Sequence, residues 1–151
     1  MSVEHHTLTH RREFAHPREV VYGAWSDPDL KRRWFDFSDD PDAEWSMSFR
    51  TGGAEVFRSA PGAQPRSTYE GRYHDIVEHE RIVLTAEITL DGRRSSVALS
   101  TAEFASTATG SVVTVTEQIT FLDGLEGPSS RSGGTTTQLA RLADLLEHPH
   151  G

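Results

Sequence analysis

The residue best placed to do chemistry in this sequence is Glu117. It lies in a strand-like segment, residues 112–121, and shares its phase with apolar side chains only, which are Val113, Val115, Ile119 and Phe121. Burying an unpaired carboxylate is costly. Glu117 is therefore either a polar anchor or a general acid–base group inside a cavity, or it is paired with a nearby arginine or placed at an open rim. The spacing leaves both interpretations open.

The eight histidines are the other candidates for chemistry. Seven of them fall into three groups, which are His5, His6 and His10; His74 and His79; His148 and His150, and His16 stands apart. None has the spacing of a metal motif such as His-Glu-x-x-His, so we expect them to be solvated at termini and loops. The chain has no cysteine and no Gly-x-Ser-x-Gly or phosphate-loop string. The sequence therefore predicts no metal and no cofactor.

Composition limits the class of protein. The chain has 151 residues, of which 35% are hydrophobic and 25% charged, and this balance predicts one domain over residues 1–151. The net charge of −8 disfavours nucleic acid and anionic membranes as partners. Neither a secretory signal nor a membrane-spanning run is apparent, so we expect a cytoplasmic protein without membrane insertion, as a monomer or a homodimer.

The first third of the chain predicts one strand and two short helices. Residues 7–14 alternate as a strand, and residues 17–25 follow as a helix with one apolar stripe of Val20, Val21, Ala24 and Trp25. Asp27 and Pro28 are typical of a second helix start. In that helix we expect Leu30 and Trp34 to be buried, and the basic run from Lys31 to Arg33 to form its solvated face.

The rest of the chain predicts six strands and a long helix. Trp45, Met47 and Phe49 alternate with polar residues, and further strands are expected near residues 55–59, 67–77, 81–90, 95–105 and 112–121. In the strand from Arg81 we expect Ile82, Leu84 and Ala86 to be buried and Arg81, Thr85 and Glu87 to be exposed. The period then changes to that of a helix, with Leu139, Leu142, Ala143 and Leu146 in phase and Pro149 beyond its end.

Several strings in this order resemble one known superfamily. Residues 14–28 (FAHPREVVYGAWSDP) and Arg33-Trp34-Phe35 look like its opening strand end and helix pair. The others are RTGG (50–53), EGRYHDI (70–76), EQ (117–118), LDG (122–124) and RSGGT (131–135). Together they resemble the START-like superfamily, also called SRPBCC, in the branch named after the homologue of the heat-shock-protein ATPase activator. Gly133-Gly134 departs from that pattern, which usually has an acidic residue before a single glycine.

This resemblance implies an α+β helix-grip fold, in which a curved antiparallel sheet wraps around the long C-terminal helix. The resemblance also implies that the space between sheet and helix can hold a small apolar molecule, as in those members of this shape that bind lipids, hormones or polyketides. The sequence also places many aromatic side chains on inward faces, and together with the resemblance this predicts a ligand-binding cavity. The expected lining residues are Trp34, Phe35, Trp45, Met47, Phe49, Tyr73, Leu84, Glu117, Leu139 and Leu142.

Three functions are compatible with these features. The first is binding or carriage of a small apolar or amphipathic ligand in the cavity. The second is an enzyme of the cyclase, dehydratase or hydrolase type, which would use the same cavity with Glu117 and His74 or Tyr73 as acid–base groups. The third, implied by the family name, is a co-chaperone-like interaction module. We expect the first, in which the ligand is held by shape and aromatic contact with one or two polar anchors.

Overall fold

The computed structural model of the chain describes residues 1–36 and 38–148. β1 (Val3–Phe14) is followed by the helices α1 (Arg18–Ser26) and α2 (Pro28–Phe35), and the chain continues into six strands before α3 (Pro128–Glu147). The six strands are β2 (Glu44–Met47), β3 (Ala54–Arg58), β4 (Ser67–Val77), β5 (Arg81–Leu90), β6 (Arg93–Thr107) and β7 (Gly110–Leu122). The predicted order of elements is confirmed.

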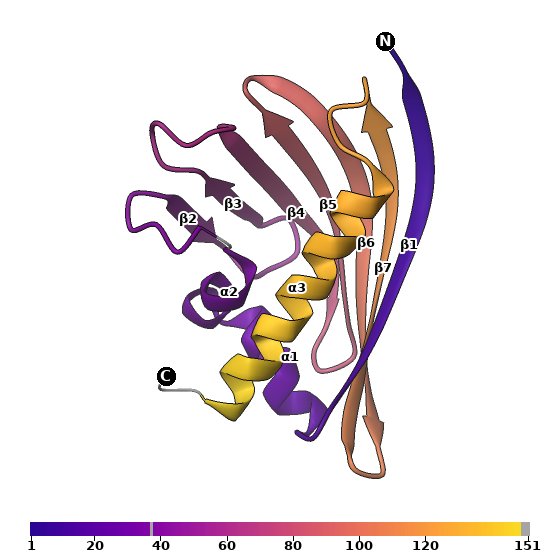
Figure 1. Cartoon of the computed structure of the whole chain (residues 1–151). Helices are drawn as coiled ribbons and strands as arrows, with labels where there is room; N and C mark the ends of the chain where they lie inside the picture. The colour runs from indigo at the N-terminus through magenta and orange to yellow at the C-terminus, as the bar shows by residue number, and fades with distance from the viewer. Residues whose placement is uncertain (37, 149–151) are drawn as a thin grey trace.

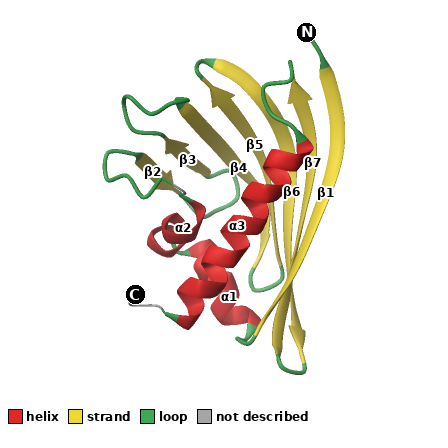
Figure 2. Cartoon of the chain, viewed as in Figure 1, coloured by secondary structure: helices red, strands yellow, loops and turns green. Residues whose placement is uncertain are grey.

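All seven strands form one antiparallel sheet in the order β1-β7-β6-β5-β4-β3-β2. β1 therefore returns to the end of the sheet formed by the last strand, while β2 and β3 form the opposite end. The sheet curves around α3, which lies diagonally across its concave face (Figure 1). Figure 2 shows α1 and α2 gathered at one end of that face. The predicted α+β helix-grip arrangement is confirmed.

The strand phases follow from one-sided burial of alternate residues. In β5, Ile82 and Leu84 are buried and Arg81 is exposed, as predicted. Thr85 and Glu87, which were expected to be exposed, are partly buried, and so is Ala86. In β7 the four apolar residues in phase with Glu117 are at most 9% exposed. A register slip by one residue would reverse these faces, so the alternation in the sequence is sufficient to fix them.

α3 is built from two unlike halves. Its C-terminal half buries Leu139, Leu142 and Leu145 against the sheet and the other helices. Its N-terminal half, residues 128–137, consists of Pro, Ser, Arg, Gly and Thr only, and contains no large apolar side chain. The helix nevertheless continues through Gly133 and Gly134. Pro149, the predicted stop signal, lies outside the described residues.

Two predictions about α1 and α2 are wrong. Val20 is 47% exposed and does not belong to the buried stripe of α1, because that stripe is formed by Val21, Tyr22, Ala24 and Trp25. Lys31 is only 2% exposed, although the basic run was expected to be solvated. Its position three residues before Trp34 places it on the buried face of α2.

Candidate functional site

A pocket of about 260 Å³ lies between the concave face of the sheet and α3. The sheet contributes Tyr69, Ile82, Leu84, Ala86, Ile88, Ala98, Ser100, Ala102, Val115 and Glu117. The helices and the segment before α3 contribute Trp25, Lys31, Trp34, Phe35, Glu126, Ser130, Arg131, Gly134, Thr135, Gln138 and Leu139. Ser130 is the exposed member of this lining, so the pocket meets solvent beside the first turns of α3.

The pocket exists because small side chains face each other across the gap. Gly134 and Thr135 of α3 lie opposite a sheet surface to which Ala86, Ala98 and Ala102 contribute methyl groups only. Farther along α3, Leu139 and Leu142 are large enough to reach the core and set the distance between helix and sheet. The gap therefore closes at the C-terminal half of α3 and stays open at its N-terminal half.

Glu117 is held in this pocket by two groups of α3. The Arg131 guanidinium donates to its Oε2 atom at 3.2 Å, and the Thr135 hydroxyl donates to its Oε1 atom at 2.7 Å. Arg131 also donates to Glu126 at 2.7 Å and to the hydroxyl of Ser96 at 2.6 Å. The first half of α3 is thus fastened to the sheet through charged and polar contacts. Of the two interpretations of Glu117, pairing with an arginine is the one that the structure shows.

A second buried ion pair joins α2 to β3. The Lys31 ammonium group donates to both carboxylate oxygens of Glu55, at 2.8 Å and 2.7 Å. Lys31 is 2% exposed and Glu55 is fully buried. Lys31 lines the pocket, and its Nζ atom lies 4.9 Å from the ring centroid of Phe35. Lys31 and Glu55 are 24 residues apart in sequence, so the pair brings together a helix and a strand from different parts of the chain.

Two tyrosines of β4 complete the shell of Glu55. The hydroxyl of Tyr69 donates to its Oε1 atom at 2.7 Å, and that of Tyr73 donates to its Oε2 atom at 2.6 Å. Burial and then the charge of Glu55 raise the pKa of Tyr69 and Tyr73 well above the ordinary value. With the ammonium group of Lys31, these hydroxyls satisfy both carboxylate oxygens, as a buried charge requires.

Gly71 explains how the carboxylate fits against the sheet. It is the register partner of Glu55 and lies between the two tyrosines on the same face of β4. A Cβ atom at this position would lie 2.9 Å from the Tyr69 hydroxyl and 3.1 Å from Cγ of Glu55. Any larger residue would therefore displace the Glu55 shell, so glycine is the residue that this packing needs.

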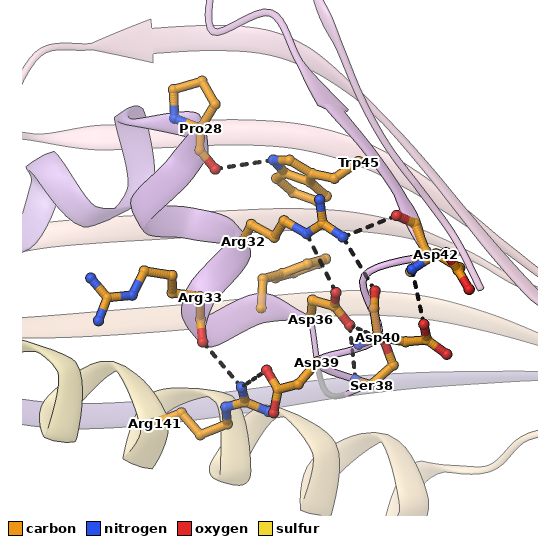
Figure 3. Close-up of polar contacts among 12 residues, drawn as sticks. Pro28, Arg32, Arg33, Asp36, Ser38, Asp39, Asp40, Asp42, Trp45 and Arg141 are labelled. Atoms are coloured by element: carbon orange, nitrogen blue, oxygen red, sulfur yellow. Dashed lines mark hydrogen bonds and ion pairs between the residues drawn. The ribbon is translucent and has the colours of Figure 1, made fainter. Parts of the chain in front are cut away.

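α2 is anchored at both ends, which fixes the position of Lys31. The Asp27 carboxylate caps the helix by accepting from the backbone N–H of Asp29 at 2.9 Å and of Leu30 at 3.2 Å. This confirms the predicted start. At the other end Arg32 donates to the carbonyl oxygen of Ala43 at 3.0 Å, so the loop after α2 folds back on the helix (Figure 3).

α3 also holds this loop. Arg141 donates to the carbonyl oxygen of Arg33 at 3.1 Å and to the carboxylate of Asp39 at 2.9 Å (Figure 3). Gln138, one helical turn earlier, donates to the carbonyl oxygen of Phe35 at 3.1 Å. The end of α2 and the C-terminal half of α3 are therefore tied together, whereas the N-terminal half of α3 contacts the strands through its own polar residues.

Half of the predicted lining residues lie at the pocket. They come from three parts of the fold and are Trp34, Phe35, Leu84, Glu117 and Leu139. Trp34 is fixed in orientation, because its ring nitrogen donates to the carbonyl oxygen of Ala24 at 2.9 Å. The sequence identified these residues through their phase, which a strand or helix translates directly into a face.

The other predicted lining residues lie elsewhere. Trp45 donates its ring N–H to the carbonyl oxygen of Pro28 and covers the outer part of α2 (Figure 3). Met47 and Phe49 are partly buried against the main core. Tyr73 binds Glu55 behind the pocket wall, and Leu142 is fully buried in the core. The short strand β2 lies at the end of the sheet, away from α3 in the centre (Figure 1).

Sequence reasoning missed Lys31 and Glu55, the two charged residues that are most deeply buried. A signal was present for each. Lys31 stands three and four residues before Trp34 and Phe35, so it shares their helix face. Glu55 shares its strand phase with Phe57, whose register partner in β2 is Trp45. Neither signal suffices alone, because a charge on an apolar face is acceptable only if its partner is there.

The histidines that the structure describes are spread over several parts of the fold. Among residues 1–36 and 38–148, no three His, Asp or Glu side chains are grouped so that they could hold a metal ion. His74 is exposed and its Nε2 atom lies 2.9 Å from the hydroxyl of Thr85, so it points away from the pocket. His150 lies outside the described residues. Within the described residues, no helix is both long and apolar enough to cross a membrane.

The sequence and the fold are similar to those of known proteins. The family described as activator of Hsp90 ATPase homolog 1-like protein matches residues 15–147. An uncharacterised protein from Rhizobium leguminosarum is 35% identical, with a TM-score of 0.91 and 97% of each chain covered. The Mll3558 protein from Rhizobium loti is 34% identical, with a TM-score of 0.88, covering 95% of this chain and 99% of that chain.

A more distant structure has the same fold. DynU16, a protein of the dynemicin biosynthetic locus, is 16% identical with a TM-score of 0.72, and the match covers 95% of this chain and 48% of that chain. At this identity the likeness concerns the fold alone. No protein of curated function matches the sequence.

Proposed function

The chain belongs to the family of activator of Hsp90 ATPase homolog 1-like proteins, and we propose that it binds a small, mostly apolar molecule in the pocket between α3 and the sheet. The observation that carries this proposal is the pocket itself. Its apolar lining includes Trp25, Trp34 and Phe35, and its opening lies beside the least apolar half of α3.

The pocket volume indicates the size of the ligand. An apolar cavity of about 150 Å³ accommodates benzene, and pockets for drug-sized molecules begin at about 300 Å³. At about 260 Å³ this pocket is suited to a molecule of one or two rings. Such a ligand gains affinity mainly through its apolar area and through contact with aromatic side chains.

We favour binding over acid–base catalysis because the carboxylates near the pocket already have partners. Glu117 accepts hydrogen bonds from Arg131 and Thr135, and Glu55 accepts them from Lys31 and two tyrosines. These contacts hold α2 and α3 to the sheet, so moving either carboxylate to act on a substrate would break a buried ion pair. The exposed side chain of His74 points away from the pocket and does not supply a general base.

A pair of neighbouring substitutions tests the proposal. Gly134 lines the pocket, whereas Gly133 is exposed and has open space where a Cβ atom would be. Gly134→Leu should therefore fill the pocket, and Gly133→Leu should leave it open. Both replace glycine in a helix by a better helix former, so neither change lowers helix propensity.

Native mass spectrometry of the protein purified from its own host gives the measurement. We expect an added mass on the wild-type protein and on the Gly133→Leu variant, and none on the Gly134→Leu variant. Titration with a small aromatic compound, followed by tryptophan fluorescence, should give the same order. If no mass is retained and no aromatic compound binds, or if Gly134→Leu binds as well as the wild type, the proposed function is wrong.

A further inference from the structure

The charges around the pocket are unevenly matched. Two cations line it, Lys31 and Arg131, and they are paired with three carboxylates: Glu55 with the first, Glu117 and Glu126 with the second. No other Lys or Arg lines the pocket within the part of the chain that the structure describes. The pocket therefore offers no positive charge that the protein has not already neutralised.

The carboxylates cannot easily give up their partners to a ligand. Glu55 is fully buried and accepts from Lys31, Tyr69 and Tyr73, and a carboxylate left without these donors inside the protein would be strongly destabilising. Glu117 is 9% exposed and holds α3 to the sheet. An anionic ligand would add a further negative charge to an enclosed site without gaining a free cation.

Lys31 nevertheless has one donor left. An ammonium group carries three N–H bonds. Two of them are directed to the oxygens of Glu55, and no third hydrogen-bond partner is found among residues 1–36 and 38–148. Lys31 lines the pocket, and its Nζ atom lies 4.9 Å from the ring centroid of Phe35, a second lining residue, which places the ammonium group close to the pocket.

We propose that the ligand is uncharged, and that a carbonyl or similar acceptor on it is bound by the free N–H of Lys31. This inference deepens the proposed function and rests on it. The Lys31 ammonium group, neutralised by Glu55, attracts the oxygen of a neutral carbonyl through a charge-assisted hydrogen bond. A carboxylate at the same place would also approach Glu55, and the repulsion between the two anions is strong where water is excluded.

Three compounds of one shape separate these possibilities: methyl naphthyl ketone, naphthoate and isopropylnaphthalene, all substituted at the same ring position. Isothermal titration calorimetry should find the ketone bound about tenfold more tightly than the hydrocarbon, and the carboxylate at least about tenfold more weakly than the ketone. The carbonyl stretching frequency of the ketone should fall when it binds. Gly134→Leu should abolish binding of all three compounds.

The anchor is tested by removing both members of the ion pair. Lys31→Met combined with Glu55→Gln leaves no buried charge, and the amide oxygen can still accept from Tyr69 or Tyr73. In this double variant the ketone should lose its advantage over the hydrocarbon, and the shift of its carbonyl frequency should disappear.

The outcomes distinguish this inference from the proposed function. Binding of the carboxylate as tightly as the ketone, or a ketone preference that survives in the double variant, overturns the inference and leaves the proposed pocket in place. If none of the three compounds binds to the wild-type protein, the inference fails, and the proposed function fails with it only if native mass spectrometry also finds no retained mass. If Gly134→Leu has no effect on any compound, both proposals fail. The comparison of ketone and carboxylate on the wild-type protein does not depend on whether the double variant folds.

Discussion

The ammonium nitrogen of Lys31 lies 2.8 Å and 2.7 Å from the two carboxylate oxygens of Glu55, and both side chains are buried beneath α2 and the sheet. This relationship joins the first third of the chain to β3 and β4. It also places a fixed cation at the wall of the pocket. Its energetic role follows from its burial, because a buried ion pair contributes little by itself but is costly to break.

Lys31→Met should lower the free energy of unfolding by about 3 to 5 kcal/mol, because it leaves the Glu55 carboxylate buried without its cation. The double variant Lys31→Met/Glu55→Gln should recover most of this loss. Urea unfolding followed by circular dichroism measures both. As a control, Arg58→Met removes an arginine that is 50% exposed and should cost about 1 kcal/mol or less. If Lys31→Met is at least as stable as the double variant, the ion pair does not have this role.

Tyr69 and Tyr73 should titrate only at strongly alkaline pH. The chain has three tyrosines, and burial raises the pKa of Tyr22, Tyr69 and Tyr73 above the ordinary value of 10.0. The folded protein therefore keeps phenol protons that the unfolded chain releases, so the free energy of unfolding should fall as the pH rises above 10.0. Ultraviolet absorbance of phenolate should appear together with unfolding.

Tyr73→Phe provides the comparison for this titration. It removes one of the retained protons, so the free energy of unfolding should fall less steeply with pH in the alkaline range. At neutral pH the same variant should be less stable than the wild type, because Glu55 loses a buried donor. Tyr22 lies outside the shell of Glu55, so phenolate absorbance from more than one tyrosine near pH 10.0 in a protein that is still folded would contradict that enclosed shell.

Leu142→Ala should destabilise the protein by about 2 to 5 kcal/mol, since this fully buried side chain closes the core between α3 and the sheet. Val20→Ala, at a position that is 47% exposed, should change the stability little. Thermal and urea unfolding of both variants give the comparison. Equal stability of the two would mean that the C-terminal half of α3 does not cover the core.

The two halves of α3 should open at different rates. Residues 128–137 have low helix propensity and rest on polar contacts, whereas the second half is held by Leu139, Leu142 and Leu145. Hydrogen exchange followed by mass spectrometry should therefore be faster over residues 128–137 than over residues 139–146. Arg131→Met should increase the difference, because it removes the contacts of this half to Glu117 and Glu126.

The variant Gly133→Ala is the control for Arg131→Met, because it should strengthen the first half of α3 instead of weakening it. Gly133 is exposed, and the added methyl group meets open space, so the change should stabilise the helix by about 0.5 to 1 kcal/mol. Exchange over residues 128–137 should then slow. Uniform protection along the whole of α3 in the wild-type protein would show that its first half is not the weaker one.

The sequence by itself determined the order of the elements and the faces of most strands. In β5 and β7 the alternation of apolar and polar residues has a period of two, and a strand converts this period directly into inside and outside. The Asp27-Pro28 pair gave the start of α2 in the same way, since a cap is a local contact between neighbouring residues. Local patterns are sufficient wherever the interaction that decides the structure is itself local.

The tertiary structure alone decided the partners of the buried charges and the place of the pocket. Lys31 looked like part of a solvated basic run, and only the approach of β3, 24 residues later, makes its burial favourable. The partner of Glu117 likewise became visible only when α3 crossed the sheet. The pocket depends on small residues of α3 and of β5 and β6 meeting across a gap whose width is set by Leu139 and Leu142, and no single segment of the sequence carries that distance.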